Sequence, residues 1–553
     1  MSTLALMPLD DRPVNYDHPW WLGRSIGIEV VRPPREWLGS PFRTAARGPL
    51  AGWLQDVGSE ADAVVVAIDT LAYGGLIPSR QSTTPLEEVV AALEPLRALR
   101  RARPGIPILA FSILMRVNRS NSGEEEKSYW LTHGREMFRL SYLEDKQACG
   151  DSDAHEDIER ETLCASLPPE FVADYQAGRA RNHQVNRLAL DWAADGIVDY
   201  ALIAQDDTAP YGWNIAEARD LRRVIERRGL AARASVYPGA DEVGSLLVAA
   251  VACRQAGFAP RVWPRYSGVD GACAVTAFED RPFGELIKAH LGPLGGSLAG
   301  GPEDADLIVA VNAPGEVQAE AWAQVLVRDQ GSVALPQHAA LIDAAALHAA
   351  RREMTSVRRD VDELARTIAA DVSAGRLVAI VDVAFANGAD LALGERLLAR
   401  VPIAQLGAYA AWNTAGNSLG SALAQGIVRS MTRREELSTE ALTAHLTLLF
   451  LHLLDDFSFQ GLVRTDILVQ DFPALGLAPS FERIPVGALP EIEARLGRRL
   501  EPHVEVLARS LGLTTIPNGN GADRRVARVR IEPPRLPWQR VFELSITPDL
   551  ELE

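Results

Sequence analysis

The chain has 553 residues, 47% hydrophobic and 23% charged, and its 73 acidic and 56 basic residues give a formal charge of -17. This length exceeds one ordinary core and predicts two or three domains, and the near-average composition excludes disordered and fibrous classes. The acidic balance argues against a nucleic-acid partner, because phosphate contacts need clustered Lys and Arg.

The cysteines and the N-terminal residues indicate in which cellular compartment the protein is expected. The 4 cysteines form no CxxC pair, so we expect no disulfide framework. The N-terminus enters an apolar β-run at once, without the basic and apolar regions of a signal peptide, and we expect no apolar run of about 18 residues or more. The sequence therefore predicts a cytoplasmic protein without a membrane partner, and it carries no signal for an oligomeric state.

The first part of the chain alternates strand and helix patterns. Apolar runs predict strands near 3–9, 28–32, 62–68, 107–114, 199–205 and 233–237, and helical periodicity covers 86–101, 214–228 and 241–255. Because strands that are apolar on both sides need helices on both faces, we expect a mostly parallel sheet in a first α/β domain, residues 1–260. A charged, helix-forming segment predicts a helical insertion at about 120–197.

A second α/β domain is predicted over residues 261–432. Its strands are expected near 262–266, 306–312, 377–384 and 403–410, with a helical stretch over about 339–374 and a glycine-rich surface loop at 292–301. Residues 433–553 are expected to be mainly helical, with a buried helix at 442–454 and terminal strands at 528–531 and 541–546. Long interruptions between the strands favour two Rossmann-like open sheets; a TIM-like (β/α)8 barrel with insertions is the alternative.

Polar clusters follow several of these strands, where parallel α/β folds bind ligands. The first is Asp10-Asp11-Arg12-Pro13-Val14-Asn15, which combines two carboxylates, a guanidinium and an amide. Adjacent carboxylates repel, so one can keep a proton and act as a general acid unless a cation compensates. A capped turn, in which Asp10 or Asp11 accepts helix N–H bonds, is the structural alternative.

Asp206 and Asp207 repeat this pattern before an aromatic pair and Asn214. Aromatic side chains can stack on a sugar while carboxylates bind its hydroxyls, although Asn214 could instead cap the following helix. Asp241 and Glu242 form a third acidic pair after a strand. For this pair we favour a structural role, in which the carboxylates stabilise the N-terminus of the following helix.

Asp69 follows the third predicted strand, and Tyr73, Gly74-Gly75 and Arg80 come shortly after it. The glycine pair lets the backbone approach a ligand closely. The segment is neither a GxGxxG nor a P-loop fingerprint, so hydrolysis of a nucleoside triphosphate has no support.

Arg116 and Asn118 follow the fourth strand and can bind anionic groups or sugar hydroxyls. Local ion pairs of Arg116 with Glu124, Glu125 or Glu126 are the structural alternative.

In the second predicted domain, polar residues again follow strands, and most of them are amides. Asn387 follows one strand, and Trp412, Asn413 and Asn417 follow another. Trp412 can stack on a sugar face while the amides bind hydroxyls. The structural alternative has Asn417 as a helix N-cap and Trp412 in the domain interface.

No zinc motif occurs, and the histidines are scattered. An all-oxygen Mg²⁺ or Mn²⁺ site built from Asp10, Asp11, Asp206 or Asp207 is possible, and no other cofactor is predicted.

Three segments carry a family resemblance: Pro8 to Asn15; Asp69 to Leu76 with Ser79-Arg80; and Trp412 to Asn417. Together they resemble the bacterial family catalogued as domain of unknown function 4127. The motifs extend from residue 8 to residue 420, so the resemblance covers most of the chain. It implies no catalytic assignment, because no activity defines the family. Members tend to lie among genes for sugar and amino-sugar uptake and breakdown, which implies a sugar-like ligand.

We hypothesise a carbohydrate-active enzyme, a glycoside hydrolase acting on a small sugar or amino sugar in an interdomain cleft, with Asp11, Asp69 and Asp207 as catalytic carboxylates. The predicted substrate-binding residues are Asp10, Arg12, Asn15, Tyr73, Arg80, Arg116, Asn118, Asp206, Asn214, Asp241, Glu242, Asn387, Trp412, Asn413 and Asn417. A Mg²⁺- or Mn²⁺-dependent sugar isomerase or lyase and a non-catalytic sugar-binding or sensing protein are the alternatives.

Overall fold

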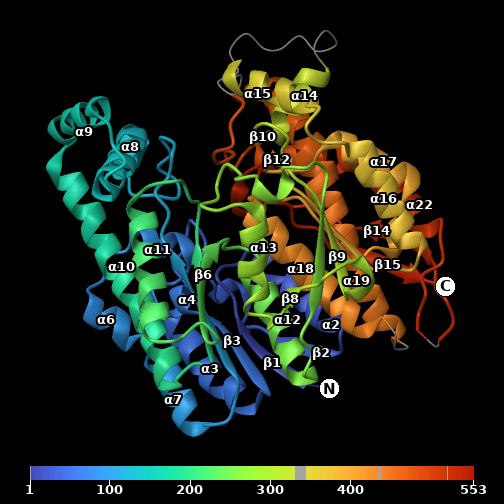
Figure 1. Cartoon of the computed structure of the whole chain (residues 1–553), viewed down its shortest axis with the longest axis horizontal. Coiled ribbons are helices and arrows are strands. Elements are labelled where there is room, and N and C mark those ends of the chain that lie inside the picture. The colour runs from blue at the N-terminus through green and yellow to red at the C-terminus, as the bar shows by residue number, and fades with distance from the viewer. Residues whose placement is uncertain (1, 330–343, 434–436, 520) are drawn as a thin grey trace. The chain divides into compact units, whose positions relative to one another are not determined.

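The computed structural model describes residues 2–329, 344–433, 437–519 and 521–553 (Figure 1). The chain forms two compact units. Unit 1 comprises Met1–Asp11, Glu29–Leu247 and Phe278–Asp280, and unit 2 comprises Arg12–Ile28, Val248–Ala277 and Arg281–Glu553. The division therefore runs through the first polar motif, between Asp11 and Arg12. The domain boundaries at 260 and 432 stay predictions.

Unit 1 is built on a six-stranded sheet with the order β2-β1-β3-β4-β5-β6. Its strands are β1 (Ser2–Met7), β2 (Ile28–Val31), β3 (Ala63–Ala67), β4 (Ile108–Leu114), β5 (Tyr200–Gln205) and β6 (Ala234–Pro238). The pairs from β1 through β6 are parallel. Every residue of β3, β4 and β5 is buried, so both faces of the sheet are covered, as the continuous apolar runs predicted.

The helices of unit 1 include the predicted insertion, drawn in teal in Figure 1. They are α3 (Arg47–Glu60), α4 (Ile68–Ala72), α5 (Leu76–Gln81), α6 (Leu86–Ala91), α7 (Glu94–Ala102), α8 (Trp130–Cys149), α9 (Ala154–Ser166), α10 (Pro169–Asp195) and α11 (Trp213–Arg227). Trp130, Met137, Leu140 and Tyr175 from α8 and α10 share a small core, which anchors the insertion. The helical insertion predicted at 120–197 is confirmed as α8, α9 and α10.

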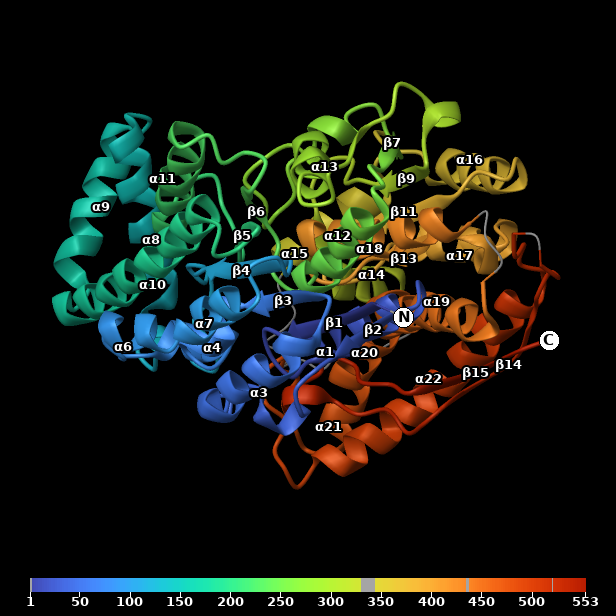
Figure 2. The ribbon, with the colours of Figure 1, turned by 90° about the horizontal axis from the view of Figure 1, so that it is seen from below.

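Unit 2 contains a five-stranded parallel sheet with the order β13-β11-β9-β7-β8. Its strands are β7 (Arg261–Tyr266), β8 (Ser297–Leu298), β9 (Leu307–Asn312), β11 (Val378–Asp382) and β13 (Ala408–Ala410). Figure 2 shows β7, β9, β11 and β13 following one another in that order. When the strands of each sheet are renumbered from 1 in chain order, both sheets have the doubly wound order 2-1-3-4-5. The sheet of unit 1 adds a sixth strand at the end. Two separate open sheets exclude the barrel alternative.

The helices of unit 2 cover this sheet and include the C-terminal region. They are α1 (Pro13–Tyr16), α2 (His18–Arg24), α12 (Val243–Ala256, from Val248 onwards), α13 (Phe283–Leu291), α14 (Ala321–Arg328), α15 (Ala344–Met354), α16 (Val361–Ser373), α17 (Leu391–Arg400), α18 (Ala415–Thr432), α19 (Thr439–His452) and α22 (Leu489–Gly512). Ile380 of β11, Leu446 of α19 and Leu496 of α22 belong to one core. The predicted helical stretch 339–374 consists of α15 and α16, and its residues 339–343 lie outside the described part of the chain.

The helix after α19 has an unusual backbone. A π-helix, η5 (Leu453–Val463), follows α19 directly, and α20 (Arg464–Asp466), η6 (Ile467–Asp471, also π) and α21 (Phe472–Ala474) complete the stretch. By length and composition Thr439–Ala474 could cross a membrane, contrary to the expected absence of such a run, but 89% of its most apolar window is buried within the structure. Its apolar character is therefore that of a core helix.

The chain ends in a small antiparallel ribbon of β14 (Val526–Ile531) and β15 (Pro548–Leu552). The strand predicted at 541–546 is wrong. Val541 and Leu544 are buried, and the only β-pairing described in this range is an isolated antiparallel bridge between Ser545 and Arg535, so no strand spans it. The terminal β-element itself is confirmed.

Close packing at Gly394 of α17 leads to a first prediction. A Cβ atom there would lie 2.0 Å from the ring of Phe457, so Gly394→Ala should lower the free energy of unfolding by about 1–3 kcal/mol. The same change at Gly178 of α10, where no atom lies within 4 Å of the new Cβ, should raise it by about 0.5–1 kcal/mol. Urea denaturation of both variants tests this, and a shift of the same sign in both would contradict it.

Candidate functional site

The strand order gives unit 1 a topological switch point. The chain moves from β1 outwards to β2 and then returns to β3 on the other side, so the connections diverge between β1 and β3. Doubly wound sheets bind ligands at such a switch point, outside the carboxyl ends of the strands. Asp10 and Asp11 follow β1, and Asp69 follows β3 in the first turn of α4.

The same edge carries a network of ion pairs, which we call the strand-end network. It consists of Arg80, Arg116, Glu125, Glu126, Asp206 and Asp207. Arg80 contacts Asp206 at 2.5 Å and Glu125 at 3.0 Å. Arg116 contacts Glu125 at 2.8 Å, Glu126 at 2.9 Å and Asp207 at 3.1 Å. The local ion pairs considered as the alternative for Arg116 are therefore present, together with a long-range pair to Asp207.

The network contains more carboxylates than guanidiniums. Burial raises the pKa of Glu126, although Arg80 and Arg116 oppose the shift. Burial likewise raises the pKa of Asp207, with Arg116 opposing the rise and Asp206 adding to it. Protons are thus retained within the network more readily than on isolated carboxylates.

Asp207 has the least common backbone conformation in the network. Its φ is 37°, in the left-handed region that non-glycine residues seldom adopt. Asn214 stabilises this turn by donating from Nδ2 to the carbonyl oxygen of Asp207 at 3.0 Å. The Asp207 side chain is 24% exposed, so it is accessible to a ligand. Strained backbone of this kind is concentrated at functional sites.

Asp69 lies deeper. Its side chain is buried, and Oδ2 accepts a hydrogen bond from the Ile113 N–H at 2.8 Å. Burial raises the pKa of Asp69 to about 7, against the hydrogen bonds from Ile113 and Ser112. Tyr73, four residues on, is also buried, with the Arg181 guanidinium 5.1 Å from its ring centre. Neither side chain contacts solvent, so a direct role with substrate would require movement.

The first polar motif is divided between the units. In unit 1, Asp10 is buried, and Asp11 forms an ion pair with Arg43 at 3.4 Å. In unit 2, Arg12 lies 3.6 Å from Glu543 and stacks over the Trp538 ring, and Asn15 is buried within α1. The N-cap position of α1 is Arg12, whose side chain makes no cap bond, and a capping role of Asp10 or Asp11 stays a prediction.

Three other predicted residues of unit 1 have local surroundings. Asn118 accepts hydrogen bonds from the N–H and hydroxyl of Ser120 at 3.0 and 2.9 Å, which is a turn contact. Glu242 accepts from the Ala240 N–H at 2.9 Å, and its neighbour Asp241 is buried beside it. The first turn of α12 contains no acidic residue, so an interaction of Asp241 and Glu242 with the helix N-terminus stays a prediction.

In unit 2 the predicted amides form a paired turn. Asn387 and Asn413 have φ of 59° and 68°, and the Asn387 N–H donates to the Asn413 carbonyl at 2.9 Å. Thr414, not Asn417, caps α18, because its hydroxyl accepts from the Asn417 N–H. Trp412 is 8% exposed, and its Nε1 has no hydrogen-bond partner within the described ranges.

The carboxyl edge of the second sheet is closed by its own side chains. Asn312 donates to Asp382 at 2.9 Å and to Asp390 at 3.0 Å, and Arg359 pairs with Asp390 and with Glu353. Burial, together with Asp390, raises the pKa of Asp382 to about 8. This edge has the contacts of a structural network.

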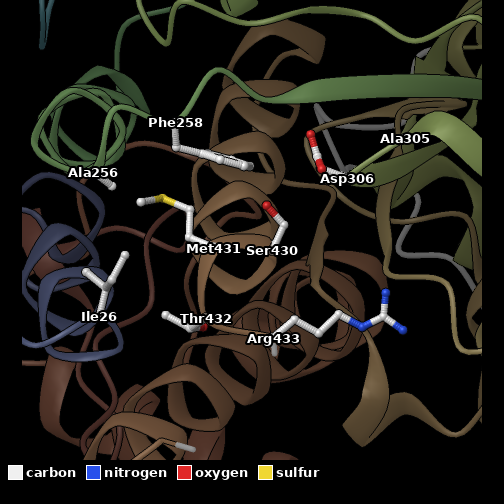
Figure 3. Close-up of a pocket in the computed structure, with 9 residues that line it drawn as sticks. All are labelled: Ile26, Ala256, Phe258, Ala305, Asp306, Ser430, Met431, Thr432 and Arg433. Atoms are coloured by element: carbon white, nitrogen blue, oxygen red, sulfur yellow. The ribbon is translucent and has the colours of Figure 1, made fainter. Parts of the chain in front are cut away.

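A ligand-sized cavity lies elsewhere in unit 2. It has a volume of about 540 Å³, and Figure 3 shows its lining: Ile26, Ala256, Phe258, Ala305, Asp306 and Ser430 to Arg433. These residues surround the amino end of β9 and the carboxyl ends of α12 and α18. None of the predicted site residues lines this cavity.

Several chemically capable residues were not predicted. His18, His452, Asp455, Asp456 and Glu543 surround a small cavity in unit 2. The signal that could have revealed them is the Asp455-Asp456 pair inside an otherwise apolar helix, since buried carboxylates are rare without a role. No group of three or more His, Cys, Asp or Glu residues in the described ranges is placed to hold a metal ion.

Comparison with known proteins gives one match. A family described as "Protein of unknown function (DUF4127)" matches residues 4–547. No curated protein and no solved structure matches the chain.

Proposed function

This chain belongs to the DUF4127 family, a family of unknown function, and we propose that it is a carbohydrate-active enzyme resembling a glycoside hydrolase. The observation that supports this most directly is the position of Asp207, strained, partly exposed and paired with Arg116 in the strand-end network. Its acid–base chemistry would act on a small sugar or amino sugar. The acidic charge and free cysteines support a cytoplasmic enzyme without nucleic-acid or membrane partners.

The roles follow from exposure and charge. Asp207, whose pKa is raised by burial and whose side chain is partly exposed, is the general acid or base. Asp206, held by Arg80, or Asp11 supplies the second carboxylate that glycoside hydrolysis requires. Asp69 is buried, and the Asp206 carboxylate adds to the rise of the pKa of Asp69.

The charge of the strand-end network favours one class of sugar. Because carboxylates outnumber guanidiniums, a neutral or cationic ligand gains more than an anionic one. An amino sugar would place its ammonium group where the network is negative. We therefore expect amino-sugar glycosides to be turned over in preference to sugar acids and sugar phosphates.

Turnover screening tests the proposal. The wild-type chain is incubated with chromogenic glycosides, including amino-sugar glycosides, and Asp207→Asn should lower kcat at least about a hundredfold. Asp220→Asn is the matched control, because Asp220 pairs with His183 and Arg187 on the surface of unit 1. Absence of wild-type turnover across the panel, or equal turnover by Asp207→Asn, would overturn the proposal. Activity lost in chelator and restored by Mg²⁺ or Mn²⁺ would indicate the isomerase or lyase instead.

A further inference from the structure

Unit 2 contains a second group of acid–base side chains around a small internal cavity. The cavity has a volume of about 20 Å³, and its wall includes His18, Trp412, His452, Asp455 and Asp456. A neighbouring cavity of about 10 Å³ shares His18 and Asp455. A buried site of this size accommodates a single water molecule or hydroxyl group when polar groups surround it.

Trp412 indicates that an oxygen atom belongs there. Its side chain is 8% exposed and lines the cavity, yet Nε1 has no hydrogen-bond partner among the described residues. The indole N–H can only donate, and a buried donor without an acceptor is destabilising. An oxygen in the cavity would supply that acceptor.

His452 is held in one orientation by Asp456. Its Nδ1 lies 3.2 Å from Asp456 Oδ2, and that oxygen also accepts the Ala411 N–H at 2.7 Å. Since the carboxylate accepts, the proton lies on Nδ1 and leaves Nε2 as a proton acceptor. A histidine oriented in this way by a carboxylate is the arrangement that hydrolytic enzymes use for a general base.

The remaining groups complete an acid–base set. Asp455 accepts from Gln460 Nε2 at 2.9 Å, and burial, then Asp456, raises the pKa of Asp455 well above its usual value. Burial lowers the pKa of His18 well below its usual value, and the His18 and His452 rings lie 4.9 Å apart. Glu543 is neutralised by Arg540 at 2.5 Å. The cavity wall thus combines an indole N–H donor, an imidazole and a carboxyl group whose pKa is raised.

Two consecutive residues of a π-helix line this cavity. In an α-helix, adjacent side chains point in directions about 100° apart. Asp455 and Asp456 both line the cavity, and they lie within η5 (Leu453–Val463). Such π-segments are rare and are often found at functional sites.

We propose that this cavity binds one water molecule and forms a second acid–base centre, independent of the strand-end network. Trp412 Nε1 donates to the water oxygen, and His452 Nε2 accepts a hydrogen bond from it. In the proton transfer, one O–H bond breaks, the proton adds to Nε2, and a hydroxide remains beside the imidazolium, which the Asp456 carboxylate stabilises. Asp455 is positioned to return a proton to the oxygen.

Crystallography and NMR of the full chain test this. We expect electron density for one oxygen within hydrogen-bond distance of Trp412 Nε1 and His452 Nε2. Trp412→Phe, which keeps an aromatic ring but lacks the donor, should lose this oxygen. An empty cavity in the wild type, or an oxygen that persists unchanged in Trp412→Phe, would overturn the proposal.

The tautomer of His452 provides a second, independent measurement. With ¹⁵N-labelled histidine, His452 should carry its proton on Nδ1, and Asp456→Leu, which has no acceptor atom, should remove that preference. His445 is the internal control, because its contacts to Gln425 and Leu406 do not involve Asp456. A wild-type His452 protonated on Nε2 alone would contradict the assignment of Nε2 as the base.

Discussion

An Arg359→Met variant is expected to lose about 3–5 kcal/mol of the free energy of unfolding. The Arg359 side chain is 4% exposed, and its guanidinium pairs with Glu353 at 2.6 Å and with Asp390. Methionine preserves most of the volume but leaves two buried carboxylates without their cation. The cost comes from those unpaired charges and not from lost packing, and urea denaturation measures it.

The matched control is Arg366→Met. Arg366 lies in α16 with a side chain that is 61% exposed, and it pairs with Glu363 on the surface. Because solvent screens an exposed pair, this change should shift the free energy of unfolding by no more than about 0.5 kcal/mol. Equal losses in the two variants would show that the buried ion pairs of Arg359 stabilise the fold no more than the exposed pair of Arg366.

Asp69→Asn is expected to become progressively more stable than the wild type as the pH rises. Burial raises the pKa of Asp69 from 3.8 to about 7 in the folded chain. Between these values the unfolded chain ionises while the folded chain stays protonated, so the stabilisation that Asp69 provides in acid is lost as the pH approaches 7. The difference in unfolding free energy between variant and wild type should therefore grow by about 4 kcal/mol from pH 4 to above pH 7.

Urea denaturation at several pH values from 4 to 8 measures this difference. Asp191→Asn serves as control, because Asp191 is 52% exposed on α10 and pairs with Arg228 in solvent. Its difference from the wild type should stay flat over the same range. A flat difference for Asp69→Asn would mean that Asp69 is ionised in the folded chain.

The local pattern of apolar and polar residues was sufficient to predict most of the secondary structure. β3 and β4 are continuous apolar runs, and a strand buried on both faces leaves that signature in any sequence. β15 (Pro548–Leu552) was missed because it is short, begins with proline and alternates with exposed acids. The division of the first motif between Asp11 and Arg12 has no local signal, since it depends on which segments each residue packs against.

The candidate site was predictable in position but not in chemistry. Asp206 and Asp207 could be located from the strand that precedes them. Their ion pairs with Arg80 and Arg116 join segments far apart in sequence, and the raised pKa of Asp207 depends on burial, which the sequence does not show. The acids of η5 were missed because an apolar helix predicts only core.

The sequence by itself determined the α/β class, the family and the strand-end position of the polar residues, because each depends on periodicity or on contiguous motifs. Only the tertiary structure decided which of those polar groups form ion pairs or hydrogen bonds with one another. Arg80 and Asp206 neutralise each other across 126 positions of the chain, whereas Trp412 keeps a donor without a partner in the described residues. The physical reason is that ion pairs, burial and pKa arise from distant segments that only folding brings together.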